Sequence, residues 1–437
     1  MANDTLGKWR KTHFANEISP KLDGKEVTIM GWVREVRQLG SISFVILADR
    51  TGNVQVTFLK KHEELFNKVS TLNREDVIAI KGEVQKAEKS NRGVEVIPSE
   101  IKVLNQSITP LPLEVTGKTP ADLDTRLNAR VLDLRKPEVS AIFKIRNTIL
   151  SAARDYFKSS NFLEIETPKI IASASEGGAA LFPVSYFEEE AFLRQSPQLY
   201  KELMTAAFER VFEIGPVFRA EPSDTPRHLA EVVQMDVEMG FADETDTWEV
   251  LEGMVHHIYK EVSEKCADEL KTLGRELKVP KIPFERKTYT EIIDLLGKNG
   301  LKLKWGEDIP PEGEKIITEH FKAPVIVYEY PMKLKPYYIH PYEKNPKLSY
   351  GFDLIGEGIE LASGGRRIHD PELYVKMLEE KGLNPKNFEE ITSFFRLGMP
   401  PHAGWAIGVD RLTMVMCGLE NVREAVLFPR DLKRLNP

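Results

Sequence analysis

The sequence predicts two folds in one chain of 437 residues, a small N-terminal β-barrel followed by a larger α+β domain built on an antiparallel sheet flanked by helices. Short alternating segments fill residues 25–104, whereas the later segments mix strand and helix patterns without the regular βαβ rhythm of a parallel sheet. A proline-rich stretch separates the two parts. The length also favours two or three domains, because single hydrophobic cores rarely grow so large.

The composition is that of an ordinary globular protein, with 41% hydrophobic and 29% charged residues. The net charge of −7 provides no general basic field, so any nucleic-acid binding must use a local patch. The first residues lack an apolar signal segment, and no run of about eighteen apolar residues occurs, which predicts a cytoplasmic location without a membrane. Cys266 and Cys417 are too few for a disulfide framework and are expected to be buried.

Five strand-like segments make up the predicted barrel. They cover residues 25–36, 41–50, 53–59, 76–87 and 94–104, and residues 60–72 between the third and fourth suit a capping helix. This order is typical of an OB-fold, whose open face commonly binds single-stranded nucleic acid. An SH3-like or other small barrel fits the pattern equally well.

The next stretch, residues 109–138, is predicted to be a linker or hinge between domains at 1–108 and 139–437. Beyond it, apolar residues at helical spacing predict a helix. The segment FLEIETPKII, residues 162–171, alternates like a strand. The helical stripe consists of Ile142, Ile145, Ile149 and Ala153.

A second helix is predicted to begin in QSPQLYK, with Ser196 as its N-cap and Pro197 in its first position. Gln198 and Lys201, three residues apart, then share one face of the first turns.

The following segments predict a β-hairpin around the loop FRAEPSDTPRHL, residues 218–229. Arg219 and Glu221 are expected on the same side of the first strand, because strand side chains alternate. The returning strand would place Gln234, Asp236 and Glu238 on one polar face. A half-exposed sheet is the ordinary alternative for such a pattern.

Near the C-terminus, GWAIGVDRL contains two glycines and an arginine at the start of an expected helix. Gly404 and Gly408 are expected to allow close backbone approach, and Arg411 lies near the positive end of the helix dipole. This segment alone would be weak evidence for a site.

Taken together, three segments resemble motifs 1, 2 and 3 of class II aminoacyl-tRNA synthetases. They are FLEIETPKI with Pro168, FRAE through RHL to VEM, and GWAIGVDRL. The N-terminal barrel narrows the resemblance to the aspartyl, asparaginyl and lysyl branch. Five further segments, QSPQLYK, SEGG, YGFDL, GGRRIH and LFPRD, are similar to aspartyl-tRNA synthetases of the archaeal type, and the resemblance covers nearly the whole chain.

The resemblance implies an aspartate-tRNA ligase that uses ATP and Mg²⁺. The α-carboxylate of L-aspartate attacks the α-phosphorus of ATP, and the aminoacyl group then passes to the 3′ end of tRNA(Asp). An ionised carboxylate needs no general base, so the first step depends on alignment and charge neutralisation. Motif 1 implies a homodimer around Pro168.

For ATP, the resemblance assigns Arg219 to the α-phosphate and Arg227 with Arg411 to the γ-phosphate, so Arg219 and Arg411 are the expected catalytic residues. It assigns adenine to Glu221 and to the backbone at His228 and Leu229, although Val232 stands where relatives often carry phenylalanine. The remaining expected ATP residues are Gly408 and Glu360, and the expected Mg²⁺ ligands are Glu360, Ser363 and Asp353.

For aspartate, the resemblance brings Lys201 and Arg367 to the side-chain carboxylate. Asp236 would either meet the ammonium group or orient Lys201, and Glu176 lies in a glycine-rich loop expected to close over the substrate. The other expected aspartate-binding residues are Ser196, Gln198, Gln234 and Ser363.

In the barrel, Phe44 and Gln55 match positions that stack on anticodon bases and hydrogen-bond to them. Arg34 and Asn91 match no restrictive pattern, which favours charging of both tRNA(Asp) and tRNA(Asn). Two alternatives stay open: an asparaginyl enzyme, which tends to lack the lysine of QSPQLYK, and a non-catalytic paralogue, which usually loses a motif arginine or the barrel.

Overall fold

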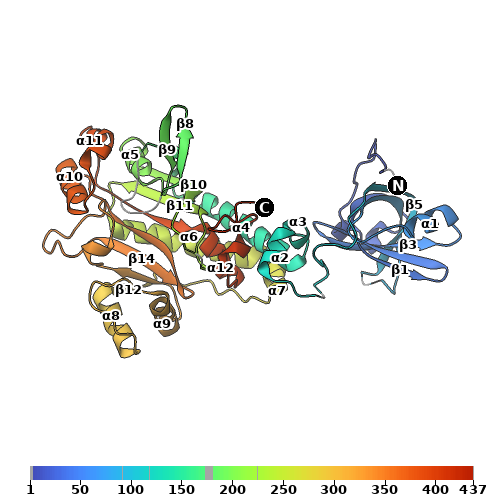
Figure 1. The fold of residues 1–437 in the computed structure, drawn as a ribbon. Coiled ribbons are helices and arrows are strands. Elements are labelled where there is room, and N and C mark those ends of the chain that lie inside the picture. Colours follow the sequence, from blue (N-terminus) through green and yellow to red (C-terminus); the bar gives the residue numbers. More distant parts are fainter. Residues whose placement is uncertain (1–2, 91, 118, 173–180, 224, 437) are drawn as a thin grey trace. The chain divides into compact units, whose positions relative to one another are not determined.

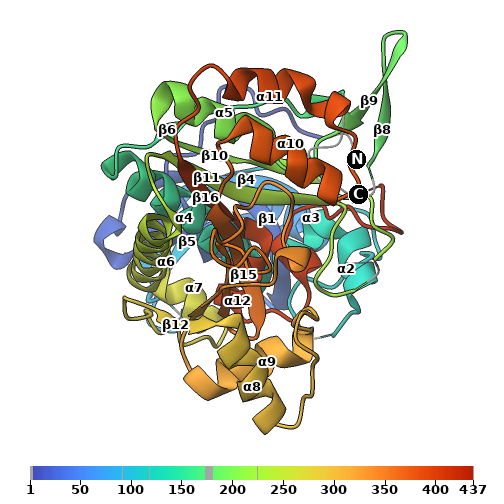
Figure 2. The same cartoon turned by 90° about the vertical axis from the view of Figure 1, so that its left-hand side faces the viewer.

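The computed structural model describes residues 3–90, 92–117, 119–172, 181–223 and 225–436. The chain divides into two compact units, Met1–Lys136 and Pro137–Pro437. Figures 1 and 2 show the elements of each unit.

The first unit contains the closed five-stranded barrel that the sequence predicts. Its strands are hydrogen-bonded in the order β1-β2-β3-β5-β4, and their inward side chains form one apolar core that includes Val33, Val45, Val56 and Ile80. Helix α1 lies between β3 and β4, as expected for the OB-fold. The elements are η1 Ala15–Glu17, η2 Pro20–Leu22, β1 Glu26–Leu39, β2 Ile42–Asp49, β3 Gly52–Leu59, α1 Glu63–Val69, β4 Val77–Lys86 and β5 Val94–Asn105.

The stretch after the barrel is more ordered than its composition suggests. It contains two short helices, α2 (Leu123–Asn128) and α3 (Arg130–Asp133). The Asp122 side chain accepts a hydrogen bond from the Thr125 N–H and so caps α2. The local cap therefore provides helical structure where no hydrophobic period was visible.

The second unit is built on an eight-stranded sheet in the order β12-β13-β14-β15-β16-β11-β10-β6. Its central strands are antiparallel, as predicted, and one parallel pair lies at each edge. The strands are β6 Leu163–Glu164, β10 Arg210–Phe218, β11 Glu231–Gly240, β12 Glu285–Thr288, β13 Val325–Tyr328, β14 Gly351–Gly356, β15 Ile359–Arg366 and β16 His402–Gly408.

The single strand expected over residues 162–171 is wrong. The structure has two two-residue strands there, β6 in the large sheet and β7 (Ile170–Ile171) in a separate three-stranded sheet. Pro168 lies between them and lacks the N–H that a continuing ladder requires. The small sheet is completed by β9 (Glu189–Leu193) and β8 (Pro183–Tyr186).

One face of the large sheet packs against helices α4 (Pro137–Ser159), α6 (Glu244–Lys265) and α12 (Val409–Cys417). The stripe predicted on α4 is buried in this core, together with Val237 of β11 and Trp405 of β16. Cys266 and Cys417 are buried and free, as expected. Because strand side chains alternate, this packing turns Gln234, Asp236 and their neighbours on β11 toward the opposite face.

The remaining helices are divided between the core described above and two separate apolar clusters. Helix α5 begins at Gln198, so Pro197 is its N-cap instead of its first residue, and Ser196, the expected N-cap, lies one position before the observed cap. No helix in the described ranges is long and apolar enough to cross a membrane. These elements are α5 Gln198–Phe208, α7 Ala267–Thr272, α8 Tyr289–Lys298, α9 Pro311–Phe321, η3 Met332–Leu334, α10 Pro371–Glu380, η4 Pro385–Phe388, α11 Glu389–Phe395 and η5 Val422–Ala425.

Candidate active site

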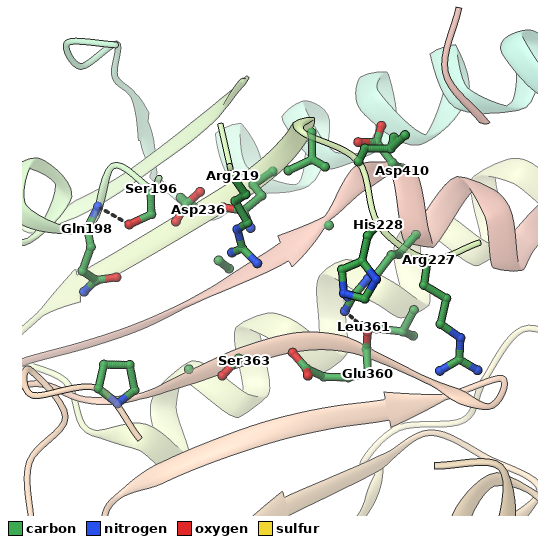
Figure 3. Close-up of a pocket in the computed structure, with 18 of the residues that line it drawn as sticks. Ser196, Gln198, Arg219, Arg227, His228, Asp236, Glu360, Leu361, Ser363 and Asp410 are labelled. Atoms are coloured by element: carbon green, nitrogen blue, oxygen red, sulfur yellow. Dashed lines mark hydrogen bonds between the residues drawn. The ribbon is translucent and has the colours of Figure 1, made fainter. Parts of the chain in front are cut away.

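A pocket lies on the polar face of the large sheet, over β11, β15 and β16. Figure 3 shows Arg219 and His228 reaching from the loop between β10 and β11 toward the strand that carries Glu360 and Ser363. The start of α5 supplies Ser196 and Gln198. The sequence-predicted residues that line it are Ser196, Gln198, Arg219, Arg227, His228, Leu229, Gln234, Asp236, Glu360, Ser363, Arg367, Gly408 and Arg411.

Two cations expected to bind the substrate carboxylate converge at the end of the pocket near α5. Lys201 Nζ lies 3.0 Å from Asp236 Oδ1 and 3.4 Å from Glu238 Oε2. Arg367 Nε lies 2.9 Å from Glu238 Oε1. Glu238, not singled out as a site residue in the sequence, therefore joins the two cations.

The four charged groups are almost fully buried, with Lys201 1% exposed and Glu238 0% exposed. Arg367 and Asp236 line the pocket. Lys201 is not among the residues that line it and lies buried behind Asp236. The two cations are thus balanced by two carboxylates within the protein.

The two carboxyl groups have opposite pKa shifts. Burial raises the pKa of Asp236, and the charge of Lys201 compensates only in part. Burial would also raise the pKa of Glu238, but Arg367 and Lys201 outweigh it and hold the pKa below its ordinary value. Glu238 is consequently the firmly ionised member of the cluster.

A second buried layer supports this cluster. The Gln198 amide donates to Glu202, and His402 Nε2 lies 3.3 Å from the other Glu202 oxygen. Gly404, opposite Glu238 on β16, is required for a steric reason. A Cβ there would collide with the Val237 carbonyl and the Glu238 carboxylate, which confirms the expected close backbone approach.

The other end of the pocket carries three arginines in a different environment. Arg411, in the first turn of α12, donates to the backbone oxygen of Glu360 at 3.2 Å. Arg227 donates to Glu314 Oε2 at 2.7 Å and to the Gly358 carbonyl at 3.1 Å. Among the described residues, no side-chain partner lies within hydrogen-bonding distance of the Arg219 guanidinium.

This end has a positive electrostatic character. Loss of solvent contact and the nearby Arg411 and Arg219 lower the pKa of His228, which favours its neutral form. The loop itself is held in place by backbone hydrogen bonds, Arg219 N to Ala230 O at 2.8 Å and Val422 N to Pro226 O at 2.8 Å.

Two expectations for this end are wrong in detail. Strand β10 ends at Phe218, so alternation no longer places Arg219 and Glu221 together. Arg219 lines the pocket, whereas Glu221 is exposed and outside the described lining. A Cβ at Gly408 would make only ordinary contacts at 3.7 Å and beyond, so close approach does not require glycine there.

The expected metal ligands are only partly assembled. Glu360 and Ser363 line the pocket, but Asp353 forms a 2.6 Å ion pair with Lys335 Nζ. Burial, followed by the charge of Asp353, raises the pKa of Glu360 to about 7, while Arg411 opposes the shift. The described residues contain no group of three His, Cys, Asp or Glu side chains arranged to hold a metal ion.

Sequence reasoning missed several residues at this site. Lys335 and Tyr338 line the pocket from a segment after η3 that belongs to none of the three motifs. Asp410 also lines it, and its Oδ2 accepts from Val233 N at 2.9 Å while Arg146 pairs with its other oxygen. The Asp410 position within GWAIGVDRL was a visible signal, whereas nothing local identified Lys335.

In the barrel, Phe44 and Gln55 lie on the outer faces of β2 and β3, alternating with the core residues Val45 and Val56. Gln55 Nε2 donates to Glu95 Oε2 at 2.9 Å. Arg34 instead pairs with Glu75 and donates to the Arg135 carbonyl. Asn91 and Glu176, two further predicted site residues, lie outside the described residues.

Comparison with known proteins agrees with this geometry. Residues 122–432 match the family of class II tRNA synthetases (D, K and N), and residues 27–104 match the OB-fold nucleic acid binding domain. The chain therefore belongs to the class II aminoacyl-tRNA synthetases of the D, K and N group.

Two archaeal relatives are similar over nearly their full lengths. The chain is 50% identical to the aspartate-tRNA(Asp/Asn) ligase of Methanopyrus kandleri over 98% of this chain and 100% of the relative. It is 48% identical to the enzyme of the same name from Methanothermobacter thermautotrophicus, over 99% and 100%.

Among solved structures, the asparaginyl-tRNA synthetase of Pyrococcus horikoshii with asparaginyl-adenylate matches with a TM-score of 0.93 and 32% identity, over 98% of this chain and 100% of that one. A putative aspartyl-tRNA synthetase from Leishmania major matches with a TM-score of 0.91 and 28% identity, over 100% and 97%. The fold is thus shared between similar proteins named for two different amino acids.

Proposed function

We propose that the chain is an aspartate-tRNA ligase that forms aspartyl-adenylate from L-aspartate and ATP and transfers the aspartyl group to tRNA. One observation supports this proposal most strongly. A single pocket has three arginines suited to phosphate binding at one end and the buried Arg367–Glu238–Lys201 cluster at the other. The archaeal relatives named aspartate-tRNA(Asp/Asn) ligases support the same substrate.

ATP occupies the end of the pocket that holds Arg219, Arg227 and Arg411. Arg219 neutralises charge on the α-phosphate while the aspartate carboxylate attacks, and Arg227 and Arg411 hold the terminal phosphate. Their planar, permanently charged guanidinium groups suit phosphate oxygens. Leu229 and the backbone of the loop contact adenine, and Glu221 reaches the base only if the loop closes by turning this exposed side chain inward.

Aspartate occupies the end formed by Ser196, Gln198, Gln234 and Arg367. Arg367 meets the substrate side-chain carboxylate, and Lys201 supports the same charge from beneath the wall. Asp236 is close enough to orient Lys201, the second of the two roles considered for it. Ser363 lines the pocket beside this end, and Glu176 belongs to the same proposed substrate set.

Class II synthetases are ATP-dependent and generally use Mg²⁺. Glu360 and Ser363 fit a magnesium position because oxygen ligands beside phosphates are what Mg²⁺ prefers, and a cation would stabilise the ionised Glu360 carboxylate. Asp353 joins this set only if it exchanges its contact with Lys335. The bound ion would neutralise phosphate charge, while the chain's own arginines align the reacting groups.

Pyrophosphate exchange tests the choice of amino acid. A polar site built around paired charges is expected to reject the uncharged amide, and sites of this kind can discriminate by about 10⁴-fold. Aspartate should therefore drive ATP–pyrophosphate exchange and asparagine should not. Equal activity with asparagine would overturn the assignment.

The outer face of the barrel is the proposed anticodon site, with Phe44 stacking on a base and Gln55 reading one. The proposed substrates are tRNA(Asp) and tRNA(Asn). Charging of both purified transcripts with labelled aspartate is the expected result, and charging of tRNA(Asp) alone would restrict the function to one tRNA.

Two further properties follow from the family. A homodimer around motif 1 is proposed, because Leu163 of the edge strand β6 and Ile170 of β7 leave apolar surface exposed beside Pro168. Sedimentation equilibrium should give twice the chain mass of 49.7 kDa. Because its tRNA substrates serve translation, the proposed location is the cytoplasm.

A further inference from the structure

Glu314 connects the triphosphate end of the pocket to a part of the fold outside the three motifs. It lies in the first turn of α9 and is 9% exposed. Its Oε2 accepts from Arg227 NH1 at 2.7 Å, while Arg227 NH2 donates to the Gly358 carbonyl at 3.1 Å. Two acceptors therefore hold both terminal nitrogens of the guanidinium group.

The second oxygen of the same carboxylate has its own partner. Glu314 Oε1 accepts a hydrogen bond from the backbone N–H of Glu360 at 3.1 Å. One buried side chain thus links the arginine of the loop between β10 and β11 to the strand that carries Glu360. Charge-assisted hydrogen bonds of this kind stabilise the contact and also fix the orientation of the groups that they join.

Helix α9 also supports the second acceptor of Arg227. Thr318, one turn after Glu314, accepts from Gly358 N at 2.9 Å and so holds the turn between β14 and β15. The helix is anchored in an apolar cluster by Ile317, which packs with Ile292 and Leu296 of α8. The contacts of Arg227 with Glu314 and with the Gly358 carbonyl consequently both depend on the position of α9.

We propose that Glu314 is a positioning residue for ATP, which holds Arg227 in the orientation that receives the terminal phosphate; this inference rests on the proposed function. Arginine has five N–H donors, and its contacts with Glu314 and Gly358 use two of them. Phosphate binding therefore does not require the Arg227–Glu314 pair to break. The carboxylate assists ATP binding instead of competing for the arginine.

The test uses Glu314→Gln in the full-length protein, measured by aspartate-dependent ATP–pyrophosphate exchange. Glutamine keeps an oxygen that can accept from Glu360 N but loses the charged contact with Arg227. The KM for ATP should rise about tenfold, the factor expected for loss of one charge-assisted hydrogen bond, with kcat and the KM for aspartate little changed. Glu312→Gln removes the same charge from an exposed position of α9 and should leave all three constants unchanged.

A second pair of variants asks whether Glu314 acts through Arg227. In an Arg227→Ala background, Glu314→Gln should cause no additional rise in the KM for ATP. Equal factors in both backgrounds would overturn the proposal, as would an unchanged or lowered KM in the single variant. If Glu314→Gln does not fold, Glu314→Asp, which retracts the carboxylate from Arg227, should give the same rise. Absence of aspartate-dependent exchange in the wild-type protein would instead refute the proposed function.

Discussion

The two ends of the pocket use charge in different ways. At the proposed aspartate end, Lys201 and Arg367 are buried and paired with the carboxylates of Asp236 and Glu238. At the proposed ATP end, Arg227 pairs with Glu314, whereas Arg411 contacts a backbone oxygen and Arg219 points into the pocket. The first arrangement keeps its charges balanced without ligand, whereas the second leaves positive charge available for phosphates. In the proposed function, the balanced end selects the amino acid and the positive end neutralises the charge of ATP.

The largest effect is expected from unbalancing the aspartate end. Glu238→Gln would leave Lys201 and Arg367 without their shared carboxylate, and removing one partner of a buried ion pair typically costs about 3–5 kcal/mol. Urea denaturation should show this loss of unfolding free energy. Glu319→Gln, an exposed change of the same charge, is the control. A loss below about 1 kcal/mol would mean that the cluster behaves like a surface ion pair.

Substitutions at the proposed ATP end should lower the rate of pyrophosphate exchange without lowering the free energy of unfolding. Arg411→Ala is expected to cost about 2.7–4 kcal/mol in transition-state stabilisation if it resembles loss of an oxyanion-type donor, and Arg219→Ala should behave similarly. ATP–pyrophosphate exchange gives the rate, and urea denaturation should be close to wild type. Arg396→Ala, at an exposed arginine, should change neither measurement. Near-normal exchange in Arg411→Ala would remove this residue from the proposed mechanism.

Substitutions in the barrel should have a smaller effect, which is confined to tRNA binding and leaves adenylate formation unchanged. Phe44→Ala should weaken tRNA binding by about 1–3 kcal/mol, the usual contribution of one stacked base, and Gln55→Ala should raise the KM for tRNA. Pyrophosphate exchange should remain intact in both variants. Gln85→Ala makes the same change as Gln55→Ala on strand β4 of the barrel and should leave the KM for tRNA unchanged. Equal loss of aminoacylation and exchange would indicate misfolding.

The smallest effect is a pH dependence at the aspartate end. The folded pKa of Glu238 lies below its ordinary value of 4.5, so its stabilising contribution is present above 4.5 and is lost as the pH falls through the folded pKa. The difference in unfolding free energy between wild type and Glu238→Gln should therefore be constant from about pH 6 to 8 and shrink below the unfolded pKa. A difference that grows toward acid pH would contradict this sign.

Local patterns were sufficient to predict a small β-barrel followed by an α+β domain with an antiparallel sheet. The five alternating segments of the barrel, the stripe on α4 and the polar alternation of β11 each reflect a period of the backbone, so they identify which face is buried. Motifs 2 and 3 contain about half of the residues that line the pocket, and motif 1 contains none of them. Those expectations failed where the chain leaves regular structure, as at Glu221 beyond the end of β10 and at Pro168 between β6 and β7.

Only the tertiary structure decided which charges meet. Arg227 and Glu314 are 87 positions apart, and Arg367 and Glu238 are 129 apart, so no window of the sequence contains either pair. Lys335 and Glu314 lie in segments without a motif and enter the site because the sheet and α9 bring them there. The sequence by itself predicted the barrel strands, the buried stripe of α4 and the alternation of β11, and it identified the proposed phosphate-binding arginines. The fold determined their partners, because the energy of a buried charge depends on neighbours in space and not on neighbours along the chain.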